Sequence, residues 1–282
     1  MASQKTTYRT TPTEFITAAN GIKYAFRRLG PKRDIPIIYF NHLTANLDNC
    51  DPRVMDGMAK EHEIISFDYR GVGQTSGEDA KSINEMAKDG IAFIKALGYA
   101  KVDIMAFSMG GFISQELMEM EPKLVRKIIL AGTGPRGGEG ISDVVGLTYW
   151  DIFKGYLTFV DPKFYLFFTS TSNGKTAANA FLKRLNERTE NRDKRVGIKT
   201  LRAQLNAIAK WGHEKPQDLS KFTLPVMVIN GDNDRMVPTP NSYDMAKRFP
   251  NATLHIYEEA AHGAVFQHHV DFVKRALEFY KS

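Results

Sequence analysis

Residues 102–111 read VDIMAFSMGG and are followed by FISQELMEM, so an apolar run, a turn of small residues and a helical pattern succeed one another. The run VDIMAF lacks polar alternation, which is typical of a strand buried on both faces of a parallel sheet. A serine at such a sharp strand-to-helix turn has its hydroxyl held above the sheet, and the helix that follows adds partial positive charge. Ser108 is therefore a candidate nucleophile, with a simple helix N-cap as the alternative role.

The turn fits the pattern G-x-S-x-G with one exception, because Ala106 stands where the first glycine is usual. Alanine is nearly as small as glycine, so the tight path from strand to helix remains open to the chain. A short motif of this kind also occurs by chance. Its meaning therefore depends on what surrounds it.

Seven further apolar runs predict strands around this one. They lie at Glu14–Thr17, Lys23–Leu29, Ile35–Phe40, Glu63–Phe67, Lys127–Ala131, Val226–Asn230 and Thr253–Tyr257. Helical periodicity occurs between many of them, most clearly at Ser82–Leu97, with Ser82 as N-cap and Glu85 closing a capping box. Further helices are expected at Gly110–Glu121 and Ala264–Lys281. This alternation predicts an α/β fold with a doubly wound, mostly parallel eight-stranded sheet.

The alternation stops between residues 134 and 222, where helical segments follow one another without a strong strand pattern. We expect this segment to be an inserted helical lid on a core made of residues 1–133 and 223–282. The lid is rich in aromatic side chains, and most of them are expected to pack the lid onto the core. Together they predict an apolar pocket roof, for which Trp150 and Tyr156 are candidate substrate-binding residues.

Composition and charge limit the classes of function. Hydrophobic residues make up 43% of the 282 residues and charged residues 25%, which is typical of a globular protein. The 38 basic residues are interleaved with 32 acidic ones, so the formal charge of +6 does not indicate nucleic-acid binding. Cys50 is the only cysteine, which excludes an intrachain disulfide. The sequence has no signal-peptide or membrane-span pattern, so a cytoplasmic protein without membrane insertion is expected.

Four sequence blocks, in this order along the chain, resemble the α/β-hydrolase superfamily from about Phe15 to the C-terminal helix. They are YFNHLTANLDN (39–49), FDYRGVGQTSG (67–77), the serine turn, and NGDNDRMVP (230–238) with AAHGAVFQ (260–267). The resemblance implies the eight-stranded core with its helical lid and a catalytic set in the chain order nucleophile, acid, base. We assign Asp68 and Arg70 of the second block to a structural turn.

The resemblance also implies the acid and the base. The turn after the run at 226–230 is similar to the family's GxxDxxxP turn, which assigns the acid to Asp234 and leaves Asp232 as a turn-forming residue. His262 lies between the last strand and the last helix, where the family has its base. His262 is then expected to take the proton of Ser108 during attack on an acyl carbon, while Asp234 orients the imidazole.

The oxyanion formed in that attack requires backbone donors. The N–H of Met109, directly after the nucleophile, is the first candidate. In relatives a His-Gly pair precedes the second donor, whereas here His42 is followed by Leu43, which leaves Thr44 as the expected donor. His42 and Leu43 are expected beside the substrate, with His42 supporting the loop rather than carrying a proton.

The resemblance implies a serine hydrolase that acts, without cofactor or metal, on a small, largely apolar carboxylic ester or lactone through an acyl-enzyme. A carbon–carbon bond hydrolase and a cofactor-free haloperoxidase or perhydrolase use the same triad, but the former commonly carries tryptophan where this chain has Gly263. Serine at position 108 excludes haloalkane dehalogenases and the related epoxide hydrolases, which need aspartate there. A binding protein of the same fold without turnover is the alternative from another class. The partner expected is a small-molecule substrate, and a homodimer is compatible with the sequence.

Overall fold

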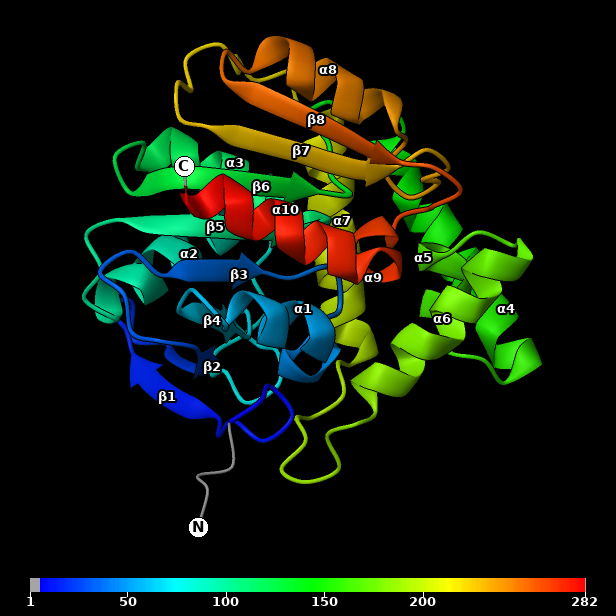
Figure 1. Cartoon of the computed structure of the whole chain (residues 1–282), viewed down its shortest axis with the longest axis horizontal. Coiled ribbons are helices and arrows are strands. Elements are labelled where there is room, and N and C mark those ends of the chain that lie inside the picture. The colour runs from blue at the N-terminus through cyan, green and yellow to red at the C-terminus, as the bar shows by residue number, and fades with distance from the viewer. Residues whose placement is uncertain (1–5, 282) are drawn as a thin grey trace.

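The computed structural model describes residues 6–281, and one eight-stranded sheet of order β1-β2-β4-β3-β5-β6-β7-β8 forms its centre (Figure 1). In this order, each successive pair of strands from β4 to β8 is parallel, while β2 pairs antiparallel with both β1 and β4. The strands are β1 (Glu14–Thr17), β2 (Lys23–Leu29), β3 (Ile37–Phe40), β4 (Ile64–Phe67), β5 (Val102–Phe107), β6 (Val125–Ala131), β7 (Val226–Gly231) and β8 (Ala252–Tyr257). The predicted doubly wound, mostly parallel sheet is confirmed, and each predicted strand end lies within two residues of the observed one.

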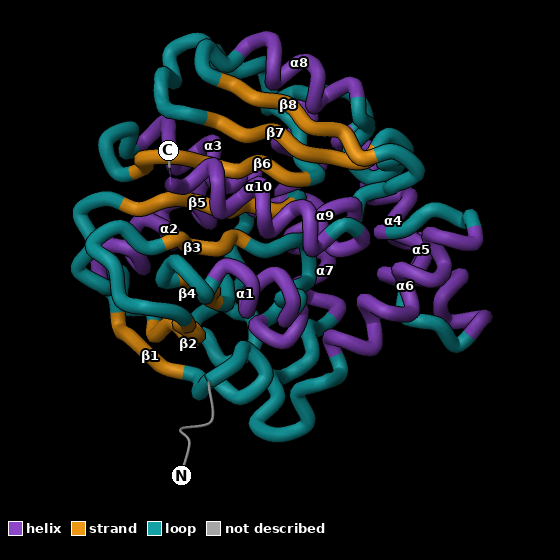
Figure 2. The backbone as a smooth tube through the Cα atoms, in the orientation of Figure 1, coloured by secondary structure: helices purple, strands orange, loops and turns teal. Residues whose placement is uncertain are grey.

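Helices cover both faces of the sheet, as the alternation of strand and helix in the sequence requires (Figures 1 and 2). On one face α1 (Pro52–Met58) packs against α10 (His269–Lys281). On the other face α2 (Ile83–Ala96) packs against α3 (Met109–Met120). At one edge α8 (Pro240–Arg248) packs on β7 and β8. Because both faces are covered, the central strands have no polar side.

Two helix ends differ in detail from the sequence prediction. The Ser82 hydroxyl accepts the N–H of Glu85 at 3.1 Å, as expected of the N-cap of α2. The Glu85 carboxylate, however, accepts the N–H of Lys81 rather than that of Ser82, so the capping box is displaced by one residue. The single helix expected at the C-terminus is divided at His268, which separates α9 (Ala264–Gln267) from α10.

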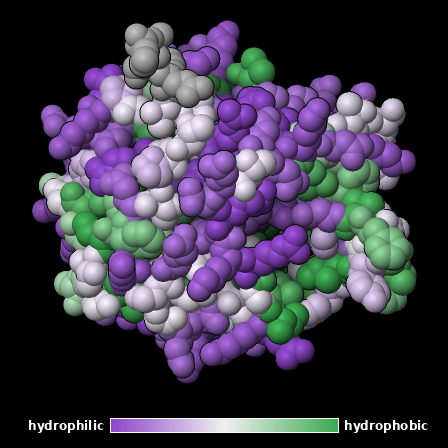
Figure 3. All heavy atoms as spheres, turned by 90° about the horizontal axis from the view of Figure 1, so that it is seen from below, coloured by the Kyte–Doolittle hydropathy of each residue, from purple (hydrophilic) through white to green (hydrophobic). Residues whose placement is uncertain are grey.

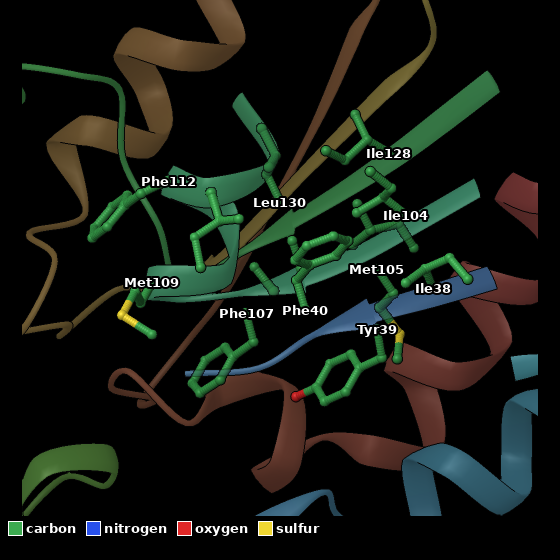
Figure 4. Close-up of a cluster of buried hydrophobic side chains, with 14 of the residues drawn as sticks. Ile38, Tyr39, Phe40, Ile104, Met105, Phe107, Met109, Phe112, Ile128 and Leu130 are labelled. Atoms are coloured by element: carbon green, nitrogen blue, oxygen red, sulfur yellow. The ribbon is translucent and has the colours of Figure 1, made fainter. Parts of the chain in front are cut away.

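The core is densest around β3, β5 and β6, at the middle of the sheet. Figure 4 shows their apolar side chains on both sides of the strands, with neighbours such as Tyr39 and Phe40 projecting in opposite directions. Ile104, Ile128 and Leu130 are completely buried. Each side chain of this size contributes about 1.5–3 kcal/mol when it is removed from water. This packing fixes the position of β5, whose carboxyl end carries Ser108.

Between β6 and β7 the described chain forms helices and no strand. Four α-helices follow a short 3-10 turn at 141–143, and we refer to them as the insertion helices: α4 (Val144–Thr158), α5 (Lys163–Phe167), α6 (Ser172–Leu185) and α7 (Ile198–His213). In Figure 1, α4, α5 and α6 lie beyond the carboxyl ends of the parallel strands. The segment expected to be a lid, residues 134–222, contains all four helices. No helix within residues 6–281 is both long enough and apolar enough to cross a membrane.

The insertion helices are attached to the core by specific side chains. The Trp211 ring of α7 stacks on Phe112 of α3 with the ring centroids 4.5 Å apart. Arg184 of α6 forms a buried ion pair with Asp51 in the turn before α1, with nitrogen and oxygen 2.7 Å apart. Breaking a buried pair by removing one partner costs roughly 3–5 kcal/mol, because the other charge then stays buried and unpaired. These contacts hold α6 and α7 in defined positions over the core.

A pair of carboxyl groups also lies between the core and the insertion. Asp68 follows β4, Asp193 lies in the segment between α6 and α7, and both carboxyl groups lie against Gly73, where any side chain would clash with them. Arg70 does not pair with Asp68, because its guanidinium lies 2.9 Å from a carboxylate oxygen of Asp89. Burial, and then the adjoining Asp193, raise the pKa of Asp68 well above its ordinary value.

Replacement of Asp68 by asparagine removes a group whose ionisation the fold opposes. Because the pKa of Asp68 is raised on folding, its contribution to stability falls as pH rises from about 4, the unfolded pKa, and is fully lost above the folded pKa. We expect Asp68→Asn to melt at or above the melting temperature of the wild type at pH 8. Between pH 5 and pH 8 the variant should lose less stability than the wild type loses. Thermal unfolding measures this, and a variant that melts several degrees lower at pH 8 contradicts it.

Candidate active site

The backbone at Ser108 is strained, and neighbouring glycines permit the strain. Ser108 joins β5 to α3 with φ 56° and ψ −121°, outside the conformations that serine ordinarily adopts. A side chain at Gly110 would clash with the carbonyl of Phe40, and one at Gly111 would clash with Thr133. Strain of this kind costs about 1–3 kcal/mol and persists only where the packing determines it. The Ser108 hydroxyl makes no capping hydrogen bond to α3, so the helix-cap alternative does not hold.

Ser108, His262 and Asp234 form one hydrogen-bonded chain. Nε2 of His262 lies 2.9 Å from Oγ of Ser108, and Nδ1 lies 2.8 Å from Oδ2 of Asp234. Oδ1 of Asp234 accepts the N–H groups of Met236 and Val237 at 2.8 and 3.0 Å, which fixes the carboxylate. With the proton of Nδ1 directed at the carboxylate, Nε2 faces the hydroxyl as an acceptor. The three side chains come from separate parts of the sequence and are buried together.

Asp232 is not part of this chain of hydrogen bonds, and its carboxylate binds backbone N–H groups of a neighbouring loop. Its carboxylate accepts the N–H groups of Glu259 and Ala260, each at 3.1 Å, and the side-chain amide of Asn233 at 2.7 Å. Although burial acts in the opposite direction, these hydrogen bonds hold the pKa of Asp232 below its ordinary value. Asp232 thereby joins the turn after β7 to the loop before His262, in keeping with its expected role in the turn.

The loop after β3 differs from expectation at the predicted oxyanion donor. Thr44 has φ 56°, and its N–H donates to Oε1 of Gln204 in α7 at 2.7 Å. This N–H is therefore already engaged, and we correct the expectation that Thr44 offers a free donor. Within residues 6–281, the N–H groups of Leu43 and Met109 have no hydrogen-bond acceptor. Leu43 lines the same cavity as Ser108, and Met109 directly follows Ser108 in the chain, so these two N–H groups are candidate oxyanion donors.

His42 supports this loop as a neutral ring. Burial, and then the Lys163 ammonium, lower the pKa of His42 to about 3. Its Nδ1 lies 2.7 Å from the carbonyl oxygen of Leu43, so in the neutral ring Nδ1 carries the proton. The ring packs edge-on against Phe107 and Phe167, with centroids 5.7 and 5.0 Å away. A ring held in this way is suited to supporting the loop and not to transferring protons.

A cavity of about 320 Å³ lies at Ser108 and His262, with walls from both the core and the insertion helices. Its apolar lining comes mainly from Leu43, Ile152, Leu166, Phe167, Val196, Ile198, Leu201 and Met236. Asp161 and Lys163 also line it, and the Lys163 ammonium lies 3.2 Å from both carboxylate oxygens of Asp161. Sequence reasoning missed this ion pair, because its position depends on how α5 packs over the core.

Trp150 and Tyr156 lie on the outer face of α4, away from this cavity. Trp150 is 63% exposed and Tyr156 is 77% exposed, whereas Thr148 and Ile152 of the same helix line the cavity. Figure 3 shows hydrophobic side chains emerging on the side of the molecule where the insertion helices lie. Because α4 carries large apolar residues around most of its circumference, aromatic content did not identify its inner face. The assignment of these two residues to the substrate pocket is therefore corrected.

The position after His262 has no room for a side chain. The N–H of Gly263 donates to the carbonyl of Phe167 at 2.7 Å, and a Cβ on Gly263 would lie 2.9 Å from both the Cβ and the carbonyl oxygen of Phe167. The Phe167 ring also packs edge-to-face on His262, with centroids 5.4 Å apart. The insertion helix α5 thus occupies the space that the tryptophan of carbon–carbon hydrolases would need.

Comparison with known proteins agrees with this fold. The family model described as the alpha/beta hydrolase fold matches residues 35–269, and the chain belongs to this family. The solved structure of an α/β-hydrolase fold protein from Chitinophaga pinensis is 37% identical and superposes with a TM-score of 0.93, covering 98% of this chain and 100% of that one. A Haemophilus influenzae protein with the name 'Putative esterase/lipase' is 24% identical, over 93% of this chain and 89% of its own. The 2-hydroxy-6-oxo-6-(2'-aminophenyl)hexa-2,4-dienoic acid hydrolase of Metapseudomonas resinovorans is 21% identical, over 94% and 90%.

Gly263→Ala tests the close contact between α5 and the loop of His262. The added methyl group must separate Phe167 from the loop, which costs about 1–3 kcal/mol and displaces the imidazole from Ser108. We expect a lower melting temperature and a lower kcat/KM in an ester assay. Gly146→Ala in α4 is the matched control, because a Cβ there meets no atom within 4 Å. If Gly263→Ala kept the stability and activity of the wild type, the close contact between Phe167 and residue 263 would be contradicted.

Proposed function

We propose that this protein is a serine hydrolase of small carboxylic esters or lactones, in which Ser108 is the nucleophile, His262 the base and Asp234 the orienting acid. The observation that carries the proposal is the continuous hydrogen-bonded chain from Asp234 through His262 to Ser108. A serine hydroxyl is a poor nucleophile near neutral pH unless a base within hydrogen-bond reach accepts its proton. Here the base is in reach and beside a cavity, and the carboxylate of Asp234 at Nδ1 favours the required tautomer.

In the first half of the reaction, Oγ of Ser108 bonds to the acyl carbon while Nε2 of His262 takes the hydroxyl proton. The negative charge moves to the carbonyl oxygen, where the N–H of Met109 and, in place of that of Thr44, the N–H of Leu43 donate to it. Each well-placed donor contributes roughly 2.7–4 kcal/mol in the transition state. His262 then protonates the departing alcohol oxygen. Water repeats the sequence on the acyl-enzyme, which releases the acid and restores Ser108.

The cavity supports a small substrate with an apolar part. A volume of about 320 Å³ lies at the lower end of ligand pockets, and most of its lining is apolar. We propose that the insertion helices act as the lid, since α4, α5 and α7 supply much of this lining. The pair of Asp161 and Lys163 adds one polar region to a pocket that the sequence predicted as largely apolar. A cytoplasmic location and a homodimer stay predictions from the sequence.

The alternatives differ in what the site offers them. The crowding at Gly263 weighs against carbon–carbon bond hydrolysis, because those relatives place a tryptophan there. A haloperoxidase or perhydrolase activity uses the same triad, and perhydrolysis of an ester in the presence of peroxide would reveal it. The engaged Thr44 N–H favours a binding protein, because it removes one expected oxyanion donor. Such a protein would release one equivalent of alcohol without steady turnover.

Ser108→Ala is the direct kinetic test of the proposed function. With p-nitrophenyl butyrate as substrate, we expect kcat to fall at least about 10³-fold, because no other group can form the acyl-enzyme. Ser114→Ala is the matched control: Ser114 is also buried and lies within α3, but its hydroxyl donates to the carbonyl of Gly110 at 2.7 Å. Steady turnover by Ser108→Ala at the wild-type rate would refute the proposed nucleophile.

The acyl chain length of the preferred ester reports the size of the cavity. Each buried methylene adds about 0.8 kcal/mol to binding until the space is full, so kcat/KM should be highest for short acyl chains and should decline towards dodecanoate. Leu201→Ala enlarges the cavity from α7, and we expect it to shift the optimum to longer chains. Leu205→Ala, on the same helix but outside the lining, should leave the optimum in place. An identical optimum in wild type and Leu201→Ala would show that esters bind elsewhere.

A further inference from the structure

One peptide unit of the loop after β3 is held at both of its ends. The peptide that links Leu43 to Thr44 has its carbonyl oxygen 2.7 Å from Nδ1 of His42 and 2.7 Å from the hydroxyl of Thr44, which donate to it. Its N–H, which belongs to Thr44, donates to Oε1 of Gln204 at 2.7 Å. The carbonyl is thus fixed from within the loop, while the N–H is fixed by a side chain of α7.

The backbone at Thr44 needs this support. A β-branched residue rarely adopts a positive φ, and Thr44 has φ 56°. Such conformations persist where surrounding contacts determine them, and they cluster at functional sites. Without the hydrogen bond from α7, the peptide plane could rotate towards an ordinary conformation. That rotation would also reorient the preceding peptide, which carries the N–H of Leu43.

The side chain of Gln204 is buried at this contact. It is 2% exposed and lies among the apolar residues on the buried face of α7. A carboxamide in such surroundings is costly unless its polar atoms are hydrogen-bonded, and the Thr44 N–H is its partner. The stacking of Trp211 on Phe112 holds α7 on the core, so Gln204 projects from a fixed support.

We propose that Gln204 is a positioning residue of the oxyanion hole. Through its carboxamide oxygen it fixes the peptide between Leu43 and Thr44, so that the Leu43 N–H stays free and, with the Met109 N–H, faces the developing oxyanion. Gln204 itself does not touch the substrate. The inference rests on the proposed serine hydrolase mechanism and adds a link from α7 to the chemical step.

Gln204→Leu removes the acceptor and keeps a side chain of similar length. With p-nitrophenyl butyrate we expect kcat to fall on the order of 10- to 100-fold, less than the ~10²–10³-fold that loss of an oxyanion donor costs. KM should change by less than about twofold, because the contact acts in the transition state and not on substrate binding. Gln204→Glu keeps an acceptor oxygen at the same place and should recover most of the loss.

Gln217→Leu is the matched control for stability. Gln217 is also 2% exposed, but its side-chain amide donates to the carbonyl of Gln115 and the carboxylate of Glu119, and neither residue lines the cavity. This variant should melt at a lower temperature and keep its kcat. All rates are measured below the melting temperatures and normalised to the active sites titrated with a phosphonate, so that misfolded protein does not enter the comparison.

Two results would overturn the inference. If Gln204→Leu is destabilised but keeps the wild-type kcat, as Gln217→Leu should, the contact is only structural. If its kcat rises, the Gln204 oxygen blocks the Thr44 N–H in the resting enzyme, which is the opposite role. Failure of the proposed function is seen separately and earlier, since wild type would then lack turnover that depends on Ser108.

Discussion

The close approach of α3 to the sheet is the constraint on which the site depends. Gly110 lies against the carbonyl of Phe40 in β3, and Gly111 lies against Thr133 beyond the end of β6, so the first turn of α3 fits between the two strands that flank β5. Only with this fit can the chain turn within one residue, which gives Ser108 its positive φ. The hydroxyl is then presented above the carboxyl end of β5, within reach of His262.

The remaining groups reach Ser108 from loops at the same edge of the sheet. In a parallel sheet the carboxyl ends of the strands meet at one edge, so the loops after β3, β5, β7 and β8 converge there although they are far apart in sequence. Hydrogen bonds of Asp232 and Asp234 then fix how the last two loops lie. The geometry of the triad is therefore a property of the whole sheet.

The insertion helices complete the site and do more than cover it. Phe167 packs on His262 and accepts the N–H of Gly263, and Lys163 lowers the pKa of His42. Gln204 binds the loop that carries the candidate oxyanion donors. Phe167 of α5 thus contacts the loop of His262, and Gln204 of α7 contacts the loop after β3. In the proposed mechanism, changes in the insertion would therefore alter the rate as well as the range of substrates.

Much of this could be read from the sequence, because it depends on local pattern. The buried strands and the serine turn are encoded within short segments, whereas Asp234 and His262 were assigned from the resemblance to the family, and the structure places the three side chains together. The inner face of α4 was not readable, since large apolar residues lie around most of that helix. The engagement of Thr44 was not readable either, because its partner Gln204 is 160 positions away and is set by tertiary packing.

Covalent labelling tests the central claim most directly. The protein is treated with a serine-reactive fluorophosphonate, and the modified residue is located by intact-protein and peptide mass spectrometry. The account predicts one adduct per chain, on Ser108, whose formation slows strongly in His262→Gln, because the hydroxyl then lacks its base. No adduct, an adduct on another residue, or labelling of Ser108 at the same rate without His262 would contradict an activated serine at this turn.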